Sequence, residues 1–322
     1  MVAVVGSEGG LVGVSASTGE YRRLDLPGWS ELDDPMGSSD IAVSADGRWV
    51  GYWYVDDGRV QGVAAYDVET DEVTRRDVTT EFGLSPNGMV WVGDRLWFSA
   101  YAFLDASASS ARGGSTTVWS PEDDEAQDLP LDRSPSFGNE SATPTSVVEP
   151  NGNGVDLYTA DGARPRSLRI DRSFTGRAVV SADEQRLAVV LDPTPSSFDG
   201  SKHGLVVLTP DGHGGTVGRR VPGVRTNEVL AWRDDRHLVV STYGHAAYQL
   251  VDVGTGRTAD FITPGSSWVP GMHLAADGWS APVYDAPAPP TPMDPRLVVG
   301  AAAAVVVLGL GALVLWRRRV RA

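Results

Sequence analysis

The chain has 322 residues and a formal net charge of −15, from 42 acidic and 27 basic residues. It contains no cysteine, which excludes disulfide bonds and thiolate metal sites. All of the acidic residues and 22 of the 27 basic ones precede residue 296, which leaves that part with a formal charge of −20. Such a surface repels phosphate backbones, so we expect no nucleic-acid partner.

Short apolar segments separated by tight polar turns fill the first 284 residues, beginning with residues 1–6, which read as a strand already inside a fold. One kind of hairpin joins two apolar strands through a turn that contains Asp or Gly. It occurs at 41–55 and 177–191, in a third copy at 272–278, and in variants at 89–99 and 229–241.

A second kind of hairpin, with a polar turn of two to four residues, follows each first one. Its copies are at 12–21, 64–73, 155–165, 205–214 and 249–258. Together the two hairpins make a unit of four strands, A to D, and the interval from Ser44 to Ala275 divides into five periods of about 46 residues. The fourth unit, near residues 137–170, fits worst: its first strand is not identifiable, and 151–154 is expected to be a loop.

Strands from the two ends of this region can close a ring. We expect inner strands from 272–284 and outer strands from 11–15 and 21–26 to share one blade, which hides their edges. The sequence therefore predicts an all-β protein, a β-propeller of six four-stranded blades. The propeller would have seven blades if residues 2–26 belong to a blade of their own whose inner strand lies upstream of this sequence. A β-sandwich or another solenoid remains the alternative.

The turn sequences Ser-Ala-Asp-Gly-Arg and Ser-Ala-Asp-Glu-Gln, each before an apolar strand, resemble those of bacterial TolB-like and WD-repeat-like propellers. The resemblance covers most of residues 1–284. The chain departs from true WD repeats because it has no Trp-Asp dipeptide. The resemblance therefore implies a fold and carries over no functional residues.

The C-terminal part predicts a membrane anchor. Residues 285–296 form a proline-rich stalk, and 297–316 are 20 consecutive apolar residues, long enough to span a bilayer as a helix. The tail, 317–322, carries four bases: Arg317, Arg318, Arg319 and Arg321. By the positive-inside rule these place the C-terminus in the cytoplasm and the propeller, 1–284, outside.

An exported domain needs an N-terminal signal, and residues 1–6 have no basic start or long apolar run. We therefore expect the true gene start to lie upstream of Met1. The alternative is a tail-anchored protein whose propeller stays in the cytoplasm.

Motifs for chemistry are scarce. The sequence has no Gly-x-Ser-x-Gly elbow, no Gly-x-Gly-x-x-Gly after a strand and no Walker motif. Its five histidines are isolated, and the acidic clusters at 56–58 and 122–125 are more typical of solvated turns than of calcium loops. We predict no catalytic residue, no cofactor and no metal.

Aromatic residues divide into two groups. The strand tryptophans are expected in the core: Trp49, Trp53, Trp91, Trp97 and Trp232. Trp29 and Trp268 lie between units, where they could face a ligand or plug a loop against the core.

Long connections predict a binding face. In a propeller the B–C and D–A connections leave on one face, here called the B–C face, and two B–C connections, 101–116 and 192–203, are unusually long. Floppy insertions without a ligand are the alternative. The candidate binding residues on this face are Trp29, Asp33, Asp34, Tyr101, Phe103, Arg112, Phe198, Asp199, Lys202 and His203.

Taken together, the sequence favours a membrane-anchored, non-enzymatic binding or scaffold domain for a protein or cell-envelope ligand. A propeller enzyme with carboxylates in the central channel, such as a hydrolase or lyase, and a sensory or assembly subunit are the alternatives. Propellers with each of these three kinds of function exist, so the fold alone does not distinguish among them.

Overall fold

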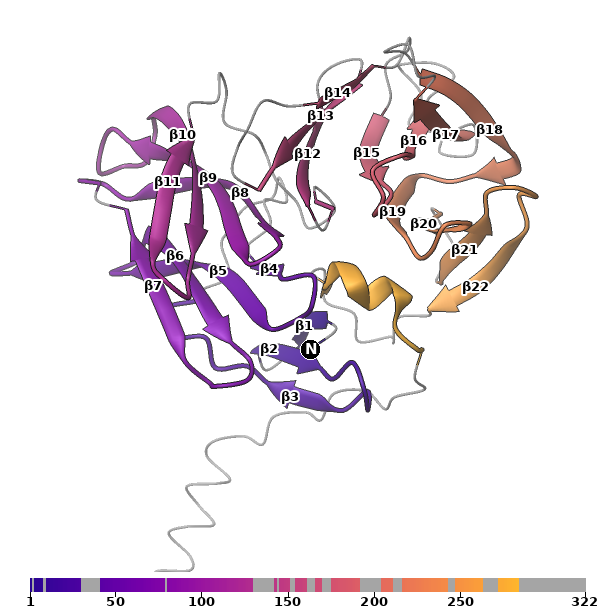
Figure 1. Ribbon diagram of the computed structural model, residues 1–322. Helices are drawn as coiled ribbons and strands as arrows, with labels where there is room; N and C mark the ends of the chain where they lie inside the picture. The colour runs from indigo at the N-terminus through magenta and orange to yellow at the C-terminus, as the bar shows by residue number, and fades with distance from the viewer. Residues whose placement is uncertain are drawn as a thin grey trace, which may run out of the picture.

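The computed structural model describes residues 1, 3–7, 10–29, 41–78, 80–129, 142–143, 145–150, 154–160, 166–169, 175–191, 204–210, 216–242, 247–262 and 272–283. Six antiparallel sheets stand around a central axis (Figure 1). The chain is therefore an all-β propeller of six blades, as the sequence predicts. Apart from one short 3-10 helix, the regular structure of the described residues is all β-strand.

The blades are numbered from the seam, where the two ends of the propeller meet. The seam blade contains β23 (Met272–Leu274), β1 (Ala3–Ser7), β2 (Gly10–Val14) and β3 (Tyr21–Arg23). Blade 2 contains β4 (Ile41–Val43), β5 (Trp49–Asp56), β6 (Arg59–Asp67) and β7 (Val73–Asp77). Blade 3 contains β8 (Leu84–Val92), β9 (Arg95–Phe103), β10 (Ala111–Ser120) and β11 (Glu125–Leu129).

The other three blades complete the ring. Blade 4 contains β12 (Ser146–Pro150), β13 (Gly154–Thr159) and β14 (Arg166–Arg169). Blade 5 contains β15 (Thr175–Val180), β16 (Leu187–Leu191), β17 (Gly204–Pro210) and β18 (Thr216–Arg225). Blade 6 contains β19 (Glu228–Trp232), β20 (His237–Ser241), β21 (Tyr248–Asp252) and β22 (Thr258–Ile262).

The predicted A–B turns close through local hydrogen bonds. The N–H of Ser44 donates to the carbonyl of Trp49, and Ser44 Oγ accepts the N–H of Trp49, both at 2.9 Å. Gly47 reaches the left-handed φ of 72° that the turn requires. In blade 5, Ser181 makes the same bonds, and Glu184 takes the left-handed position with a φ of 56°.

The C–D turns also repeat one geometry. The carbonyls of Ser15, Asp67 and Asp252 each accept the N–H of the residue four positions later, at 2.8 to 3.1 Å. That residue has a positive φ in each case: 70° at Gly19, 63° at Asp71 and 71° at Gly256. The two hairpins read from the sequence are therefore the two halves of a blade.

The seam divides its strands differently from the prediction. Among the described residues, β23 is the one strand of this blade from the C-terminal side, and β1, β2 and β3 all come from the N-terminal side. β1 pairs with β23 in the register Ala3 to Leu274, so it occupies the edge that a second strand within 272–284 would need. After β23 the chain forms the 3-10 helix η2 (Ala276–Ser280), and the N–H of Asp277 donates to the carbonyl of Ala45 at 3.1 Å.

Blade 4 shows three strands among the described residues. An isolated antiparallel bridge joins Ala142 to Val147, on the edge of β12 that faces away from β13. This is where the inner strand lies in other blades, so β12, β13 and β14 correspond to strands B, C and D. The C–D assignment of 155–165 is confirmed. The sequence did not identify a first strand for this unit, and residues 130–141, which precede the bridge, lie outside the described residues.

Hydrophobic clusters join the blades. One cluster fills each interface from the seam blade through blade 6, five interfaces in all. Four of the predicted core tryptophans are buried, and Trp232 is half-buried. Two tryptophans also bond the preceding blade: Trp91 Nε1 donates to the carbonyl of Ala42 at 3.0 Å, and Trp232 Nε1 to that of Val179 at 3.1 Å.

The predicted anchor lies outside the described residues, as do Trp268 and the stalk. Among the residues that the structure does describe, no helix is both long and apolar enough to cross a membrane.

Candidate binding surfaces

The B–C connection of blade 3 is mostly strand, which corrects the 16-residue loop expected at 101–116. Tyr101 and Phe103 belong to β9 and Arg112 to β10, because Phe103 pairs with Ala111 and Arg112 with Ala102. The connecting loop is only residues 104–110. β11 pairs with β10 only from Thr116 onward, so the first half of β10 extends beyond β11 and is exposed. We call residues 101–115 the blade 3 hairpin.

A single carboxylate organises the tip of this hairpin. Asp105 accepts the N–H of Ser107 at 3.0 Å and the hydroxyl of Ser110 at 2.6 Å, and it also accepts the hydroxyl of Ser107. These hydrogen bonds, the one from the Ser107 hydroxyl foremost, lower the pKa of Asp105. The N–H of Leu104 donates to the carbonyl of Ser110 at 3.0 Å. The tip is thus an ordered turn, although its sequence Ala-Ser-Ala-Ser-Ser suggests a floppy insertion.

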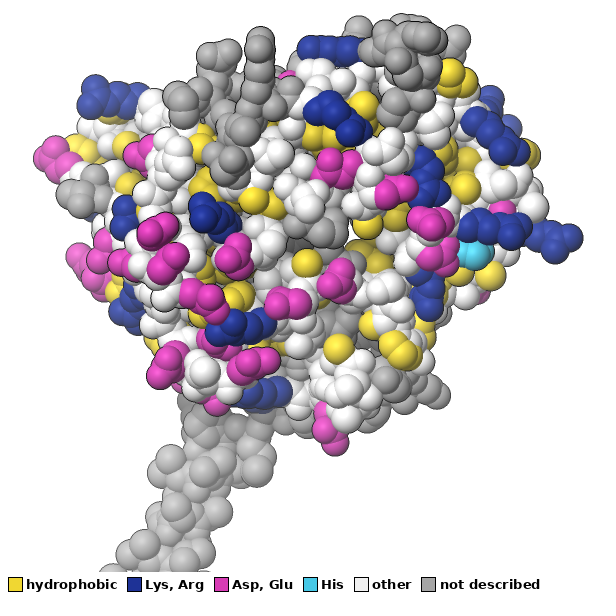
Figure 2. All heavy atoms as spheres, in the orientation of Figure 1, with side chains coloured by type: hydrophobic (Ala, Val, Ile, Leu, Met, Phe, Trp, Pro, Cys, Tyr) yellow, Lys and Arg dark blue, Asp and Glu magenta, His cyan; other side chains and the backbone are white. Residues whose placement is uncertain are grey.

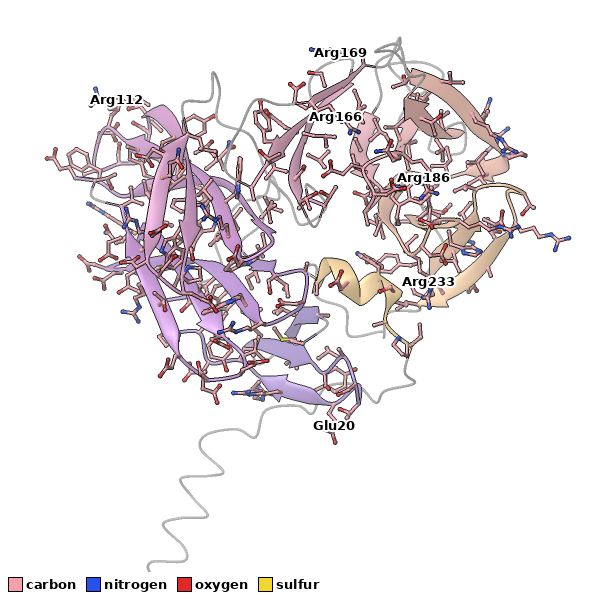
Figure 3. All side chains as sticks on the ribbon, in the orientation of Figure 1. Glu20, Arg112, Arg166, Arg169, Arg186 and Arg233 are labelled. Atoms are coloured by element: carbon pink, nitrogen blue, oxygen red, sulfur yellow. The ribbon has the colours of Figure 1, made fainter. Side chains whose placement is uncertain are left out.

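Apolar and aromatic groups are presented along the hairpin. Tyr101 and Phe103 are two positions apart on one strand, so they lie on the same side of the hairpin, and both are half-buried. Leu104 is 45% exposed at the tip. Arg112, labelled in Figure 3, is exposed and lies on the other side of the strand pair. An ordered projection with two aromatic rings, an exposed leucine and one cation is suited to contact another protein.

Trp29, the described residue of the predicted D–A connection, packs as a plug. It is half-buried against the cluster between the seam blade and blade 2, and its Nε1 is enclosed. Gly28 before it has a φ of 77°, and a Cβ there would lie 2.3 Å from the Tyr54 ring. Of the two expectations for Trp29, ligand contact or loop plug, its packing fits the plug.

The remaining candidate residues lie outside the described part of the chain: Asp33, Asp34, Phe198, Asp199, Lys202 and His203. Their place on the B–C face stays a prediction.

The opposite face carries the A–B and C–D turns and is held by ion pairs. Arg48 in an A–B turn lies 2.9 Å from Asp67 Oδ2 and 2.6 Å from Glu122 of blade 3. Arg236 and Asp252 repeat the first pair in blade 6 at 2.7 Å. Figure 2 shows acidic and arginine side chains interspersed over the visible face. These carboxylates hold turns and neighbouring blades together, which is a structural role.

Asp67 gives this network a pH dependence. Its side chain is 4% exposed. Burial raises the pKa of Asp67, but the hydrogen bonds from Arg48 and from the N–H of Glu69 outweigh it, and the pKa is lower than its ordinary value.

We expect Asp67→Asn to destabilise the propeller by about 1.5–3 kcal/mol at pH 7, the range for hydrogen bonds of charged groups. Because the folded pKa is depressed, this stability is present above the unfolded pKa of about 3.9 and is lost as pH falls through the folded value. Urea unfolding at a series of pH values measures the difference in unfolding free energy between wild type and the variant. This difference should disappear below about pH 4. Asp235→Asn removes an ion pair with Arg186 whose carboxylate is 94% exposed, and it serves as the control with little effect. If the difference in unfolding free energy between wild type and Asp67→Asn does not change with pH, this account is wrong.

Metal ligands do not gather in the part of the chain that the structure describes, where no group of three His, Asp or Glu side chains could hold an ion. His237 contacts Asp234, with Nδ1 2.9 Å from Oδ2, and Asp234 also accepts two backbone N–H groups of the A–B turn of blade 6. This His–Asp contact therefore shapes a turn.

Arg233 is a residue that the sequence analysis missed. It lies in the A–B turn of blade 6 at the position of Ser44 and Ser181, and its N–H donates to the carbonyl of His237 at 2.9 Å. Its guanidinium stacks on the ring of Phe261, 4.4 Å from the centroid. An arginine where blades 2 and 5 have serine was the available signal.

Comparisons with known proteins bear on the fold. No family model matches the chain, and no curated protein matches it. Among solved structures it is similar to TolB from Acinetobacter baumannii, with a TM-score of 0.53 and 13% identity over 84% of this chain and 64% of that one. It is also similar to a chain of a nidogen–laminin complex, with a TM-score of 0.50 and 14% identity over 86% of this chain and 98% of that one. The fold is thus a TolB-like propeller.

An enzyme also appears among the similar structures. Oligogalacturonate lyase in complex with manganese matches with a TM-score of 0.45 and 13% identity, over 71% of this chain and 66% of that one. Sequence identities of 13–14% support similarity of fold and nothing about function.

Proposed function

We propose that this chain is a membrane-anchored propeller that acts outside the cytoplasm as a non-enzymatic binding or scaffold domain. Its ligand would be a protein or a component of the cell envelope, taken on the B–C face. The anchor rests on the apolar run 297–316 and the arginines after it.

The blade 3 hairpin carries this proposal. Its outer half, residues 111–115, extends past β11 and is exposed, and Asp105 holds the tip at 104–110 in one conformation. An ordered tip beside an exposed strand segment is a surface suited to contact. A rigid tip also loses little conformational entropy on binding, which favours affinity. The B–C connection at 192–203 and the D–A connection with Asp33 and Asp34 would extend the same surface.

The direct test shortens the hairpin without disturbing the blade. Since Phe103 pairs with Ala111, residues 104–110 can be replaced by Asn-Gly, which closes a two-residue hairpin. We expect the shortened chain to unfold at the wild-type temperature and to lose the partners that copurify with the full chain from native membranes.

A matched pair of point variants sharpens this test. Leu104→Ser and Val217→Ser both remove an exposed aliphatic side chain, 45% and 60% exposed respectively. Val217 lies on β18, away from the hairpin. Leu104→Ser should weaken copurification and Val217→Ser should not. Retention of every partner by both hairpin variants would rule out this binding surface.

A further inference from the structure

Blade 3 differs from the other blades in how far its outer strand reaches. In the other five blades the outer strand, or the residue directly after it, hydrogen-bonds strand C to within two residues of the end at the B–C face. In blade 3 the last pair toward that face joins Thr116 to Leu129, and Ala111–Ser115 of β10 lie beyond it. Five residues of β10 therefore have a strand, β9, on one side only.

A glycine bulge accounts for the early end of this pairing. The register of β9 and β10 shifts between Arg112 and Ser115, which inserts one extra residue into β10 at the glycine pair 113–114. Gly113 has a φ of 59°, a left-handed conformation that glycine adopts without strain. A bulge of this kind bends its strand and increases the local twist. The bulge thus turns the blade 3 hairpin away from β11 and leaves the outer edge of β10 open.

The open edge is accessible to another chain. All five residues Ala111–Ser115 are exposed. Within the described part of the chain, their backbone groups make no hydrogen bond outside the pairing with β9. Nothing lies within 4 Å of the position that a Cβ on Gly113 would take. A row of free N–H and C=O groups is a template for a further strand.

Side chains beside this edge indicate what a further strand would carry. On one side of the hairpin, β10 places only Ala111 and glycine next to Tyr101 and Phe103, so side chains of an added strand can reach both rings. On the other side, Arg112 is exposed (Figure 3) and forms no ion pair with a carboxylate that the structure describes. One side of the edge is therefore suited to apolar side chains and the other to acidic ones.

We propose that the blade 3 hairpin binds its partner by strand addition, in which an extended segment of another protein pairs with the open edge of β10. The backbone of this segment bonds the free groups of Ala111–Ser115. Successive side chains of a strand point to opposite faces, so the segment alternates apolar residues, toward Tyr101 and Phe103, with acidic residues, toward Arg112. This inference rests on the proposed function and names the form of its partner.

A second copy of this chain is a poorer occupant of the edge. Two copies that paired through β10 would bring their Arg112 side chains near one another. They would also join two chains that each carry a formal charge of −15. Like charges oppose such a contact. The occupant is therefore a different protein.

Peptide selection on the full-length chain in detergent tests this inference. The probe is a phage-displayed library of random twelve-residue peptides, selected in parallel on wild type, Arg112→Glu and Arg59→Glu. Wild type should enrich sequences that alternate apolar and acidic residues. Arg112→Glu should enrich basic residues in place of the acidic ones. Arg59→Glu reverses an exposed cation at the B–C end of blade 2 and should keep the wild-type preference.

Methylation of the peptide backbone distinguishes strand pairing from contact through side chains alone. Two forms of a selected peptide are made, one N-methylated at the odd residues and one at the even residues. Each form loses the N–H donors of one edge and keeps every side chain. Fluorescence anisotropy with wild type should show that one form binds at least about tenfold more weakly than the unmodified peptide, and that the other keeps its affinity.

The selected peptide also separates this inference from the proposed function. Added in excess to the complex purified from native membranes, it should release the partner. Failure to enrich alternating sequences, an unchanged preference in Arg112→Glu, equal binding of the two methylated forms or a partner that stays bound would each overturn strand addition. A dimer of the chain that the peptide dissociates would also overturn it, because a second copy would then occupy the edge. The proposed function survives all of these results if the shortened hairpin still loses its partners.

Discussion

A chain that lacks residues 1–26 is expected to lose cooperative unfolding. The deletion removes β1, β2 and β3, and with them the strand to which β23 is hydrogen-bonded. It also removes four buried aliphatic residues from the cluster with blade 2: Val4, Leu11, Leu24 and Leu26. At about 1.5–3 kcal/mol for each buried side chain, the loss is roughly 6–12 kcal/mol. Domains are stable by only about 5–15 kcal/mol, so little folded chain should remain.

Tryptophan fluorescence during urea unfolding measures this result, since five tryptophans are buried in blades 2 and 3. A single substitution, Val4→Ala, provides a graded comparison and should destabilise the chain by about 1–3 kcal/mol without abolishing the transition. If the deleted chain unfolds at the wild-type urea concentration, the N-terminal strands do not close the ring.

The repeat was predictable because its signals are local. Ser44 and Ser181 each bond residues within five positions, so the tetrapeptide that forms the turn also identifies it. Five well-spaced copies of such turns fixed the blade period. The fourth blade was hardest to read because its described turn has Thr143 where blades 2 and 5 have serine: Thr143 Oγ1 accepts the N–H of Ser146 at 2.9 Å.

The seam could not be read in the same way. Residues 272–278 match the first strand and turn of a blade, but their partner is β1 at the far end of the chain. Pairing between distant segments leaves no mark in either local sequence. Pro282 was the available hint, because proline rarely continues a central strand.

The candidate surfaces divide along similar lines. The sequence located the blade 3 hairpin but treated all of 101–116 as a loop, whereas only residues 104–110 connect the two strands. The missed signal was Asp105 followed by serines at 107, 109 and 110, all of which bond its carboxylate.

The central claim, a binding propeller held outside the cytoplasm by a C-terminal anchor, is tested most directly by cysteine accessibility in intact cells. Two full-length variants each carry one reporter: Val217→Cys, on a surface position of the propeller that is 60% exposed, and Ala322→Cys, in the tail. The account predicts that a membrane-impermeant maleimide labels Val217→Cys in intact, wall-stripped cells and labels Ala322→Cys only after lysis. Protection of Val217→Cys until lysis would contradict it and would place the propeller in the cytoplasm.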